Sequence, residues 1–306
     1  MSALADWLSA TVGLAKPVTV TRLGTGHSRA MLVAAGADGR RVVVRMEQGG
    51  VFGTSGVEES RVMRGLRAAG YPVAEIVAEE PTGDVCGQPF FVMAFVDGAT
   101  AADERSVDAQ TAAAFVAELH RLHEMGGRDL GFDLQPSTAA EATARQIDRW
   151  AAIYRAAADE PIPLLEEAAA WLHRFVPDGG TLGVVHGDAG PGNFVHADGK
   201  VVVVTDWEFA HLGDPAEDWA FCLTMRGVRT MSRQAWLDLF ATHAGVRLTE
   251  DEWSYWEAFN LFKGACANRT CLRLFESGGN RAPNMAIIGT VLHQVFLRRL
   301  VDIVHT

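Results

Sequence analysis

Hydrophobic and polar residues in the first third of the chain are arranged as expected for β-strands. Three strand-like segments, 19–23, 30–34 and 41–46, are separated by turn-forming residues, and the first of them is apolar and β-branched. Residues 57–69 instead repeat their hydrophobic positions at helical spacing, and a continuous apolar run at 89–96 has the length of a further strand. This part of the chain is therefore predicted to form an antiparallel sheet with one helix.

The rest of the chain has mainly helical periodicity. Ala-rich segments with hydrophobic residues three and four positions apart predict helices at 109–125, 139–158 and 164–176. Short strand-like segments occur at 183–185, 193–196 and 201–205. We predict an α+β fold with two lobes. A small antiparallel-sheet N-lobe covers residues 1–97, and a larger, mainly helical C-lobe covers residues 98–306.

One short block in the second part of the chain has the spacing of a kinase catalytic loop. It has the sequence HGDAGPGN at residues 186–193, and Asp206 follows the strand-like segment that ends at Thr205. In such loops one aspartate accepts the proton of the attacking hydroxyl, while an amide and a second acid hold metal on the phosphates. We therefore predict Asp188 as the catalytic base and Asn193 and Asp206 as Mg²⁺ ligands. We predict a structural role for His186.

Three features of the predicted N-lobe suit the binding of nucleotide phosphates. A flexible turn, whose backbone can lie close to phosphate groups, contains Gly24, Gly26 and Ser28. Arg45, on the third predicted strand, is the candidate cation for the phosphates. Glu59, on the following helix, is predicted to orient that cation, with Glu58 as the second candidate.

Acidic residues are concentrated around the catalytic-loop motif. The chain has a net charge of −11, and residues 183–220 hold seven acids against the single base Lys200. The net charge argues against non-specific binding to nucleic acid, which depends on Lys and Arg. The acidic segment suits a solvated face, divalent cations or a cationic substrate.

Composition indicates a globular protein of a reducing compartment. Hydrophobic residues make up 48% and charged residues 21% of the chain. No stretch approaches the roughly 20 apolar residues of a membrane span. The N-terminus lacks a basic segment followed by an apolar one, and the four cysteines form no Cys-x-x-Cys pair. We therefore expect a cytoplasmic protein without membrane or nucleic-acid partners, and we leave its oligomeric state open.

The motif block and several other segments resemble the aminoglycoside phosphotransferase family, within the choline-kinase-like and protein-kinase-like superfamily. The main match covers residues 186–221, with the pattern His-Gly-Asp…Asn…Asp-Trp-Glu. Supporting segments lie at 58–66, 89–98 and 119–125. The segment ARQIDRW at 144–150 is similar to the kinase portion of acyl-CoA-dehydrogenase fusion proteins.

This resemblance implies a bilobal fold that binds ATP or GTP between its lobes, with Mg²⁺ on the phosphates. It places the adenine against the backbone near Ala94 and Val96, and the substrate hydroxyl against Asp188. Most members of the family carry lysine where this chain has Arg45. Arginine keeps the charge but presents a planar fork instead of a compact ammonium group. Some branches similar to the acyl-CoA-dehydrogenase fusions carry arginine there as well.

The leading hypothesis is a small-molecule O-phosphotransferase that moves the γ-phosphoryl group of ATP or GTP to a hydroxyl group. We favour a metabolic acceptor, with aminoglycoside or macrolide antibiotics as the alternative. A catalytically silent binding protein on a kinase fold is a second alternative. A third, a metal-dependent phosphohydrolase, would need several ligand histidines, and the motif contains only His186.

Overall fold

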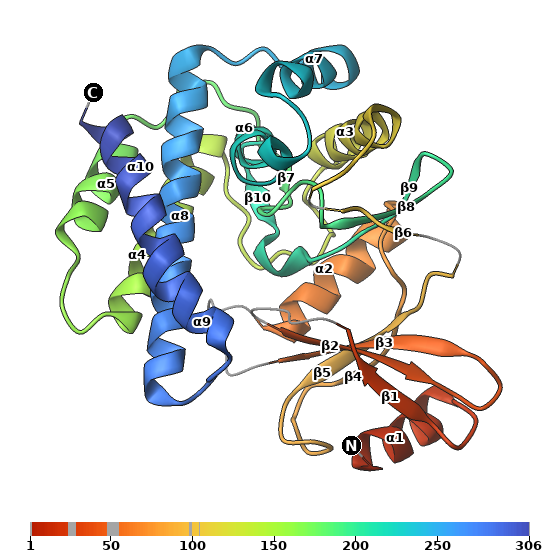
Figure 1. The fold of residues 1–306 in the computed structure, drawn as a ribbon. Helices are drawn as coiled ribbons and strands as arrows, with labels where there is room; N and C mark the ends of the chain where they lie inside the picture. Colours follow the sequence, from red (N-terminus) through yellow and green to blue (C-terminus); the bar gives the residue numbers. More distant parts are fainter. Residues whose placement is uncertain (1, 24–28, 48–54, 98–99, 104, 306) are drawn as a thin grey trace. The chain divides into compact units, whose positions relative to one another are not determined.

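The computed structural model describes residues 2–23, 29–47, 55–97, 100–103 and 105–305. The chain forms two compact units (Figure 1). The first consists of Met1–Ala99 together with Asp129–Gly131, and the second of Thr100–Arg128 together with Phe132–Thr306.

The first unit is built on a five-stranded sheet with the strand order β1-β2-β3-β5-β4, in which every neighbouring pair is antiparallel. Its elements are α1 (Ser2–Trp7), the π-helical turn η1 (Leu8–Val12), β1 (Thr19–Arg22), β2 (Arg29–Ala35), β3 (Arg41–Glu47), α2 (Gly56–Ala68), β4 (Ile76–Glu80) and β5 (Phe90–Ala94). The sequence pattern missed β4, which has an irregular register against β5 and ends in two glutamates.

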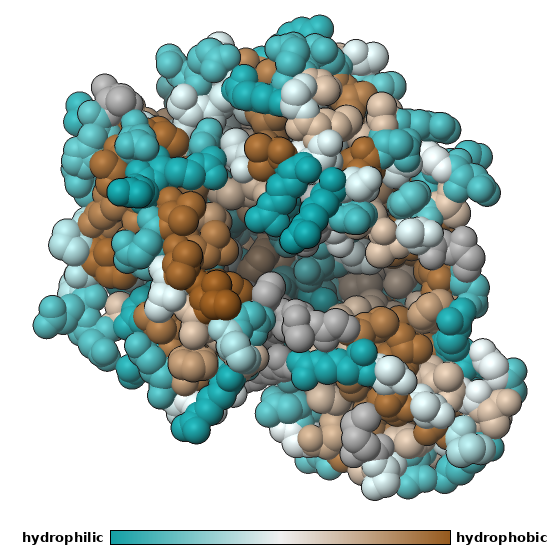
Figure 2. All heavy atoms as spheres, viewed as in Figure 1, coloured by the Kyte–Doolittle hydropathy of each residue, from teal (hydrophilic) through white to brown (hydrophobic). Residues whose placement is uncertain are grey.

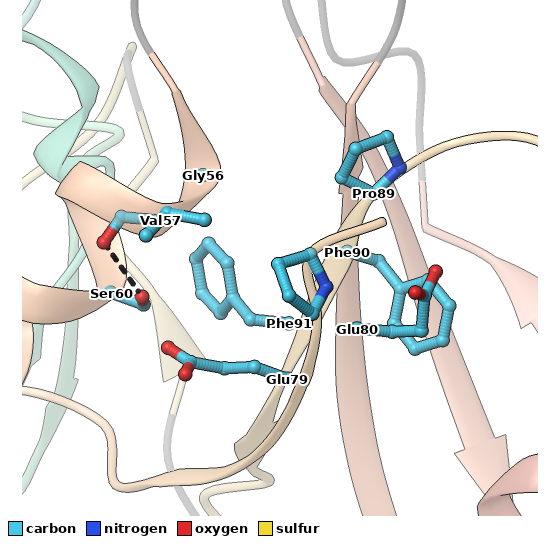
Figure 3. A pocket seen from close by; sticks show the side chains of 9 residues that line it. Gly56, Val57, Ser60, Glu79, Glu80, Pro89, Phe90 and Phe91 are labelled. Carbon is cyan, nitrogen blue, oxygen red and sulfur yellow. Dashed lines mark hydrogen bonds between the residues drawn. The ribbon is translucent and has the colours of Figure 1, made fainter. Parts of the chain in front are cut away.

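The side chains of β3 point alternately to the two faces of this sheet, and each face packs against different elements. Val42 and Val44 are buried in a core with Leu8 of η1. The alternate residues of β3, Arg45 among them, point to the opposite face, because side chains alternate along a strand. Arg45 pairs with Phe91 of β5 in the register, so both side chains lie on this second face. Figure 3 shows Phe91 beside the first turn of α2.

The second unit is mainly helical and is organised around the long helix α8, which packs against α4, α6 and α10 (Figure 1). Its α-helices are α3 (Ala109–His123), α4 (Ala139–Ala157), α5 (Pro163–Arg174), α6 (Ala216–Phe221), α7 (Arg233–Ala244), α8 (Glu250–Ser277), α9 (Pro283–Ile287) and α10 (His293–Val304). Its shorter turns are η3 (Trp207–Phe209), η4 (Cys222–Arg226), η5 (Gly227–Arg229) and η6 (Ile288–Leu292). The antiparallel sheet of the first unit and these helices confirm the predicted α+β class.

Two small antiparallel sheets in the second unit carry the predicted catalytic loop. β7 (Gly183–Val185) pairs with β10 (His211–Gly213), and β8 (Phe194–Ala197) lies between β6 (Thr100–Ala101) and β9 (Lys200–Val204). The sequence pattern located β7, β8 and β9. It missed β6, which has only two residues, and β10, whose sequence His-Leu-Gly has a single apolar side chain.

Apolar side chains gather on the surface over α9 and α10 (Figure 2). Ile287, Val291 and Val295 are exposed there, whereas Leu300 of α10 is buried. In the part of the chain that the structure describes, no helix is long and apolar enough to cross a membrane.

Candidate active site

The β8–β9 hairpin brings the two predicted metal ligands together. Asn193 immediately precedes β8, and Asp206 lies just beyond β9. The backbone N–H of Thr205 donates to the carbonyl of Asn193 at 2.9 Å. Asp206 is the residue after Thr205, so this hydrogen bond holds its backbone close to Asn193. Asp206 has a left-handed backbone with φ 68°. Aspartate is among the few residue types that tolerate this conformation, which turns the chain sharply after the strand.

Asp188 lies in the loop between β7 and β8 and contacts Asn193 directly. The Asn193 Nδ2 group donates to the backbone oxygen of Asp188 and to its Oδ2, both at 2.8 Å. Because both amide hydrogens are used in this way, the Asn193 Oδ1 atom faces away from Asp188. The structure therefore brings together the predicted base and one predicted metal ligand.

Arg226, at the end of η4, is a site residue that the sequence pattern did not identify. Its Nε atom donates to Asp188 Oδ1 at 2.8 Å, and its Nη2 atom donates to Asp188 Oδ2. The guanidinium thus meets the carboxylate as a two-pronged fork. Arg226 lies 38 positions further along the chain, and no local spacing links the two residues.

A buried acid from α6 holds the start of the catalytic loop. Asp218 is fully buried and accepts hydrogen bonds from the backbone N–H groups of His186 at 2.7 Å and Gly187 at 2.8 Å. It also accepts one from His123 Nε2 at 3.0 Å. Burial alone would raise the pKa of Asp218, but the hydrogen bond and charge of His123, together with the backbone N–H of His186, lower it below its ordinary value. Asp218 therefore stays ionised and braces the loop.

The His186 ring is committed to the same loop. Its Nε2 atom lies 2.8 Å from the carbonyl oxygen of Thr205, and its Nδ1 atom lies 3.2 Å from the backbone N–H of Asp188. A neutral ring with its proton on Nε2 satisfies both contacts. This geometry supports a structural role for His186.

A second brace reaches the loop from α8. The buried Lys263 Nζ group donates to the carbonyl of Gly187 at 2.7 Å and to Glu217 Oε1 at 2.6 Å. The other oxygen of Glu217 lies 3.2 Å from His211 Nε2. Burial would raise the pKa of Glu217, but Lys263 and His211 lower it. Gly187 is therefore held on both sides, its N–H by Asp218 and its carbonyl by Lys263.

Asp214 differs from the other acids of this segment. Its Oδ1 accepts from the backbone N–H of Ala216, the first residue of α6, at 2.9 Å. Burial, with a further contribution from the charge of Glu217, raises the pKa of Asp214 to about 6. Asp214 therefore acts on the helix and not on the loop.

In the first unit, one buried glutamate serves two arginines. Arg45 Nε lies 2.8 Å from Glu59 Oε1, as the sequence pattern led us to expect of this pair. Arg29 Nε lies 3.1 Å from Glu59 Oε2, and Arg29 Nη1 lies 3.3 Å from Glu47 Oε1. The pattern did not identify Arg29. Glu58, the second candidate, forms a capping box with Ser55 at the start of α2 instead.

Of the other residues predicted to contact the nucleotide, three lie outside the described residues and two lie within them. Gly24, Gly26 and Ser28 lie outside the described residues. Ala94 is half-buried at the end of β5, where its N–H donates to the carbonyl of Glu75 at 2.9 Å. Val96 is half-buried in the irregular segment that follows β5.

A small pocket in the first unit is not the phosphate site. It lies between the first turn of α2 and strands β4 and β5, and Glu79 and Glu80 are among its lining residues (Figure 3). Glu79 pairs with Arg64 at 2.8 Å, and Glu80 accepts from the backbone N–H of Gly83 at 2.9 Å. Most of the other described lining residues are apolar, so they offer a phosphate no cation.

The donor set beside the catalytic loop suits Mg²⁺. In the part of the chain that the structure describes, no cluster of three or more His, Cys, Asp or Glu side chains is arranged to hold a metal ion. Mg²⁺ does not need such a cluster, because it keeps several waters and binds through one or two protein oxygens plus substrate phosphates. The outward-facing amide oxygen of Asn193 and the carboxylate of Asp206 are oxygen donors of that type.

Comparison with known proteins places these features in a family. The sequence profile of the Phosphotransferase enzyme family matches residues 19–259. Acyl-CoA dehydrogenase family member 10 of Mus musculus is 26% identical over 278 residues, which cover 81% of this chain. The chain spans 22 to 33% of the length of the curated relatives of this kind.

Solved structures show the same fold at lower sequence identity. A choline kinase of Streptococcus pneumoniae has a TM-score of 0.71 and 15% identity, with 98% of each chain covered. A thermostable aminoglycoside phosphotransferase, solved with ADP and hygromycin B, has a TM-score of 0.63 and 16% identity, with 97% of this chain and 98% of that chain covered. These matches confirm the predicted kinase-like fold.

Proposed function

Because the chain belongs to the Phosphotransferase enzyme family, we propose that it transfers the γ-phosphoryl group of ATP or GTP to a hydroxyl group of a small molecule. Membership confirms the predicted class of small-molecule phosphotransferase. The nucleotide, the catalytic base and the metal ligands are the parts that we propose.

The arrangement of Asp188 and Asn193 in a loop braced from two helices is the observation that carries this proposal. For phosphoryl transfer a protein mainly has to position the reacting groups and neutralise the charge on the phosphates. In the proposed step the acceptor hydroxyl oxygen forms a bond to the γ-phosphorus, and the bond from that phosphorus to the departing nucleoside diphosphate breaks. The hydroxyl proton passes to the carboxylate of Asp188.

Asn193 and Asp206 are the proposed ligands of Mg²⁺, and we assign them no other part in the reaction. When bound, the ion would neutralise charge on the phosphates and orient them.

Arg45 is the proposed partner of the α- and β-phosphates, and Glu59 orients its guanidinium. We propose that the turn containing Gly24, Gly26 and Ser28 lies along the phosphates. The backbone near Ala94 and Val96 is the proposed contact of the nucleotide base. The phosphotransferase solved with ADP supports nucleotide use by this fold.

The contacts of the acidic segment favour an acceptor that is not a polycation. Asp188 is paired with Arg226, Glu217 with Lys263, and Asp218 with His123 and the loop backbone. These carboxylates are therefore occupied within the unit and do not form a free acidic surface. We propose a metabolic hydroxyl compound as the acceptor and keep aminoglycosides and macrolides as the alternative.

A coupled assay of ADP and GDP release over amino alcohols, sugars, hydroxy acids, aminoglycosides and macrolides tests this function. We expect turnover with at least one non-antibiotic acceptor, and none in an Asp188→Ala variant that still binds nucleotide. Turnover on aminoglycosides alone would contradict the proposed acceptor class. An absence of nucleotide binding at millimolar Mg-ATP and Mg-GTP would contradict the function itself and favour a silent binding protein.

A further inference from the structure

We propose that Arg226 is a positioning residue for phosphoryl transfer, which orients the carboxylate of Asp188 toward the acceptor hydroxyl. This inference rests on the proposed role of Asp188 as the base. Its basis is the two-pronged contact in which Arg226 Nε meets Asp188 Oδ1 at 2.8 Å while Nη2 meets Oδ2. Two parallel hydrogen bonds fix the plane of a carboxylate, whereas a single bond leaves it free to rotate.

The hydrogen bonds on Asp188 distinguish its two oxygens. Each carboxylate oxygen has two lone pairs that can accept hydrogen bonds. Oδ2 accepts from Asn193 Nδ2 at 2.8 Å and from Arg226 Nη2, which uses both of its positions. Among the described residues, Oδ1 accepts a side-chain bond only from Arg226 Nε. The geometry therefore assigns Oδ1 as the atom that accepts the proton of the acceptor hydroxyl.

Arg226 is also fitted to the turn that follows Asp188. Its Nη1 atom lies 3.4 Å from the carbonyl oxygen of Pro191. Gly190 has φ +144°, and a Cβ atom there would lie 2.7 Å from Arg226 Cβ. Any larger residue at position 190 would therefore push the arginine away. The absence of a side chain at Gly190 leaves space for Arg226 beside the loop. The Arg226 guanidinium then contacts both Asp188 and Pro191, the two ends of the segment 188–191.

The role of Arg226 differs from that of the two buried braces. Asp218 and Lys263 hold backbone groups of residues 186 and 187, and neither contacts the Asp188 carboxylate. Arg226 instead holds the reacting group itself. Its loss should leave the loop in place while the carboxylate gains rotational freedom. The expected defect therefore falls on the transfer step and not on folding or nucleotide binding.

The chemistry of the step is compatible with this pairing. A base bound to a cation is a weaker proton acceptor, but phosphoryl transfer needs little basicity because its transition state is loose. The hydroxyl proton moves to Oδ1 as the acceptor oxygen bonds to the γ-phosphorus and the bond to the nucleoside diphosphate breaks. Orientation of the base is then more important than its strength.

The test compares Arg226→Gln and Arg226→Lys with a matched control, Arg233→Gln. Arg233 lies 3.8 Å from Glu250 in an exposed pair, so its loss should not affect transfer. The assay uses the best acceptor from the release screen with Mg-ATP. We expect kcat to fall about a hundredfold in Arg226→Gln and about tenfold in Arg226→Lys, because lysine keeps the charge and loses the fork. The KM for ATP should stay within about twofold of wild type.

A rescue experiment distinguishes positioning from a structural role. Methylguanidinium added to Arg226→Ala should restore part of kcat, and it should not restore Asp188→Ala. The inference is overturned if Arg226→Gln keeps its kcat, or if kcat, nucleotide binding and melting temperature all fall together without rescue. If wild type itself transfers phosphate to no acceptor, the proposed function fails instead, so the two failures are distinguishable.

Discussion

The two units differ in the balance of buried positive and negative side chains around their candidate sites. In the first unit, the buried carboxylate of Glu59 is shared by two buried arginines, Arg29 and Arg45. In the second unit, the buried acids are Asp188, Glu208, Asp214, Glu217 and Asp218. Among the described residues of that unit, Lys263 is the one buried lysine or arginine.

This difference indicates a division of chemical roles. Under the proposed function, arginines held in place by the carboxylates of Glu59 and Glu47 would contact the nucleotide phosphates. Under the proposed function, acids paired with Lys263, His123 and the loop backbone would position the loop that holds Mg²⁺ and accepts the proton. Both arrangements are held by internal contacts, so each can be broken by a single substitution.

The largest effect is expected from Asp206→Asn. Asparagine tolerates the left-handed backbone of this position, so the change removes a charge and leaves the chain path intact. We expect kcat to fall about a thousandfold, because a proposed Mg²⁺ ligand is lost. The steady-state rate as a function of Mg²⁺ concentration measures this loss. Asp198→Asn, at another left-handed position of the same hairpin, is the control and should behave as wild type.

Glu59→Gln should strongly destabilise the first unit. Two buried guanidiniums would lose the charge that they share, and breaking a buried pair costs about 3 kcal/mol or more of unfolding free energy. Urea denaturation followed by tryptophan fluorescence measures the change. Glu58→Gln alters only the capping box and should cost about 0.5 kcal/mol. Equal losses in the two variants would refute a special role for Glu59.

Arg29→Gln tests whether the second arginine of this cluster contributes to nucleotide binding. We expect the dissociation constant for ADP to rise about tenfold, with a similar rise for Arg45→Gln, because each change removes one positive charge. Calorimetric titration with ADP and Mg²⁺ gives both values. An unchanged dissociation constant for ADP in Arg29→Gln would mean that, of these two arginines, only Arg45 contributes to phosphate binding.

Asp214 gives the smallest effect and a definite pH dependence. Burial raises its pKa from 3.8 to about 6, so the folded protein binds the proton more tightly than the unfolded chain does. Ionisation of Asp214 therefore lowers stability as the pH rises through this interval. Asp214→Asn should gain about 1 kcal/mol of unfolding free energy at pH 8, since a neutral amide is easier to bury.

Denaturation of wild type and Asp214→Asn at a series of pH values checks the sign. The advantage of the variant should shrink below pH 6 and disappear near pH 4. An advantage that grew on acidification would contradict the assignment.

The parts of the site that the sequence predicted are those set by local spacing. Asp188 and Asn193 are five residues apart, and a hairpin brings Asp206 back beside them, so a motif contains all three. The strand–helix order likewise predicted that Arg45 and Glu59 would meet.

The missed residues reach the site through tertiary packing. Lys263 contacts Gly187 from 76 positions away, and Arg226 contacts Asp188 from 38. Both lie in helical sequence where a single basic residue gives no signal. Arg29 directly follows Ser28 of the predicted glycine turn in the sequence, but only the pairing of β2 with β3 places it on the same face as Arg45. In the acidic segment, the sequence left a cationic substrate possible, and the contacts show that Asp214, Glu217 and Asp218 stabilise the fold.

The central claim, that Asp188 accepts the proton in a transfer from nucleotide to hydroxyl, is tested most directly in a single turnover with γ-labelled ATP. Wild type and Asp188→Asn would be compared with the same acceptor after ADP binding has been measured for both. The account predicts that wild type moves the label onto the acceptor and that Asp188→Asn does so at least about a hundredfold more slowly, with ADP affinity unchanged. Transfer at equal rates in the two proteins would contradict it.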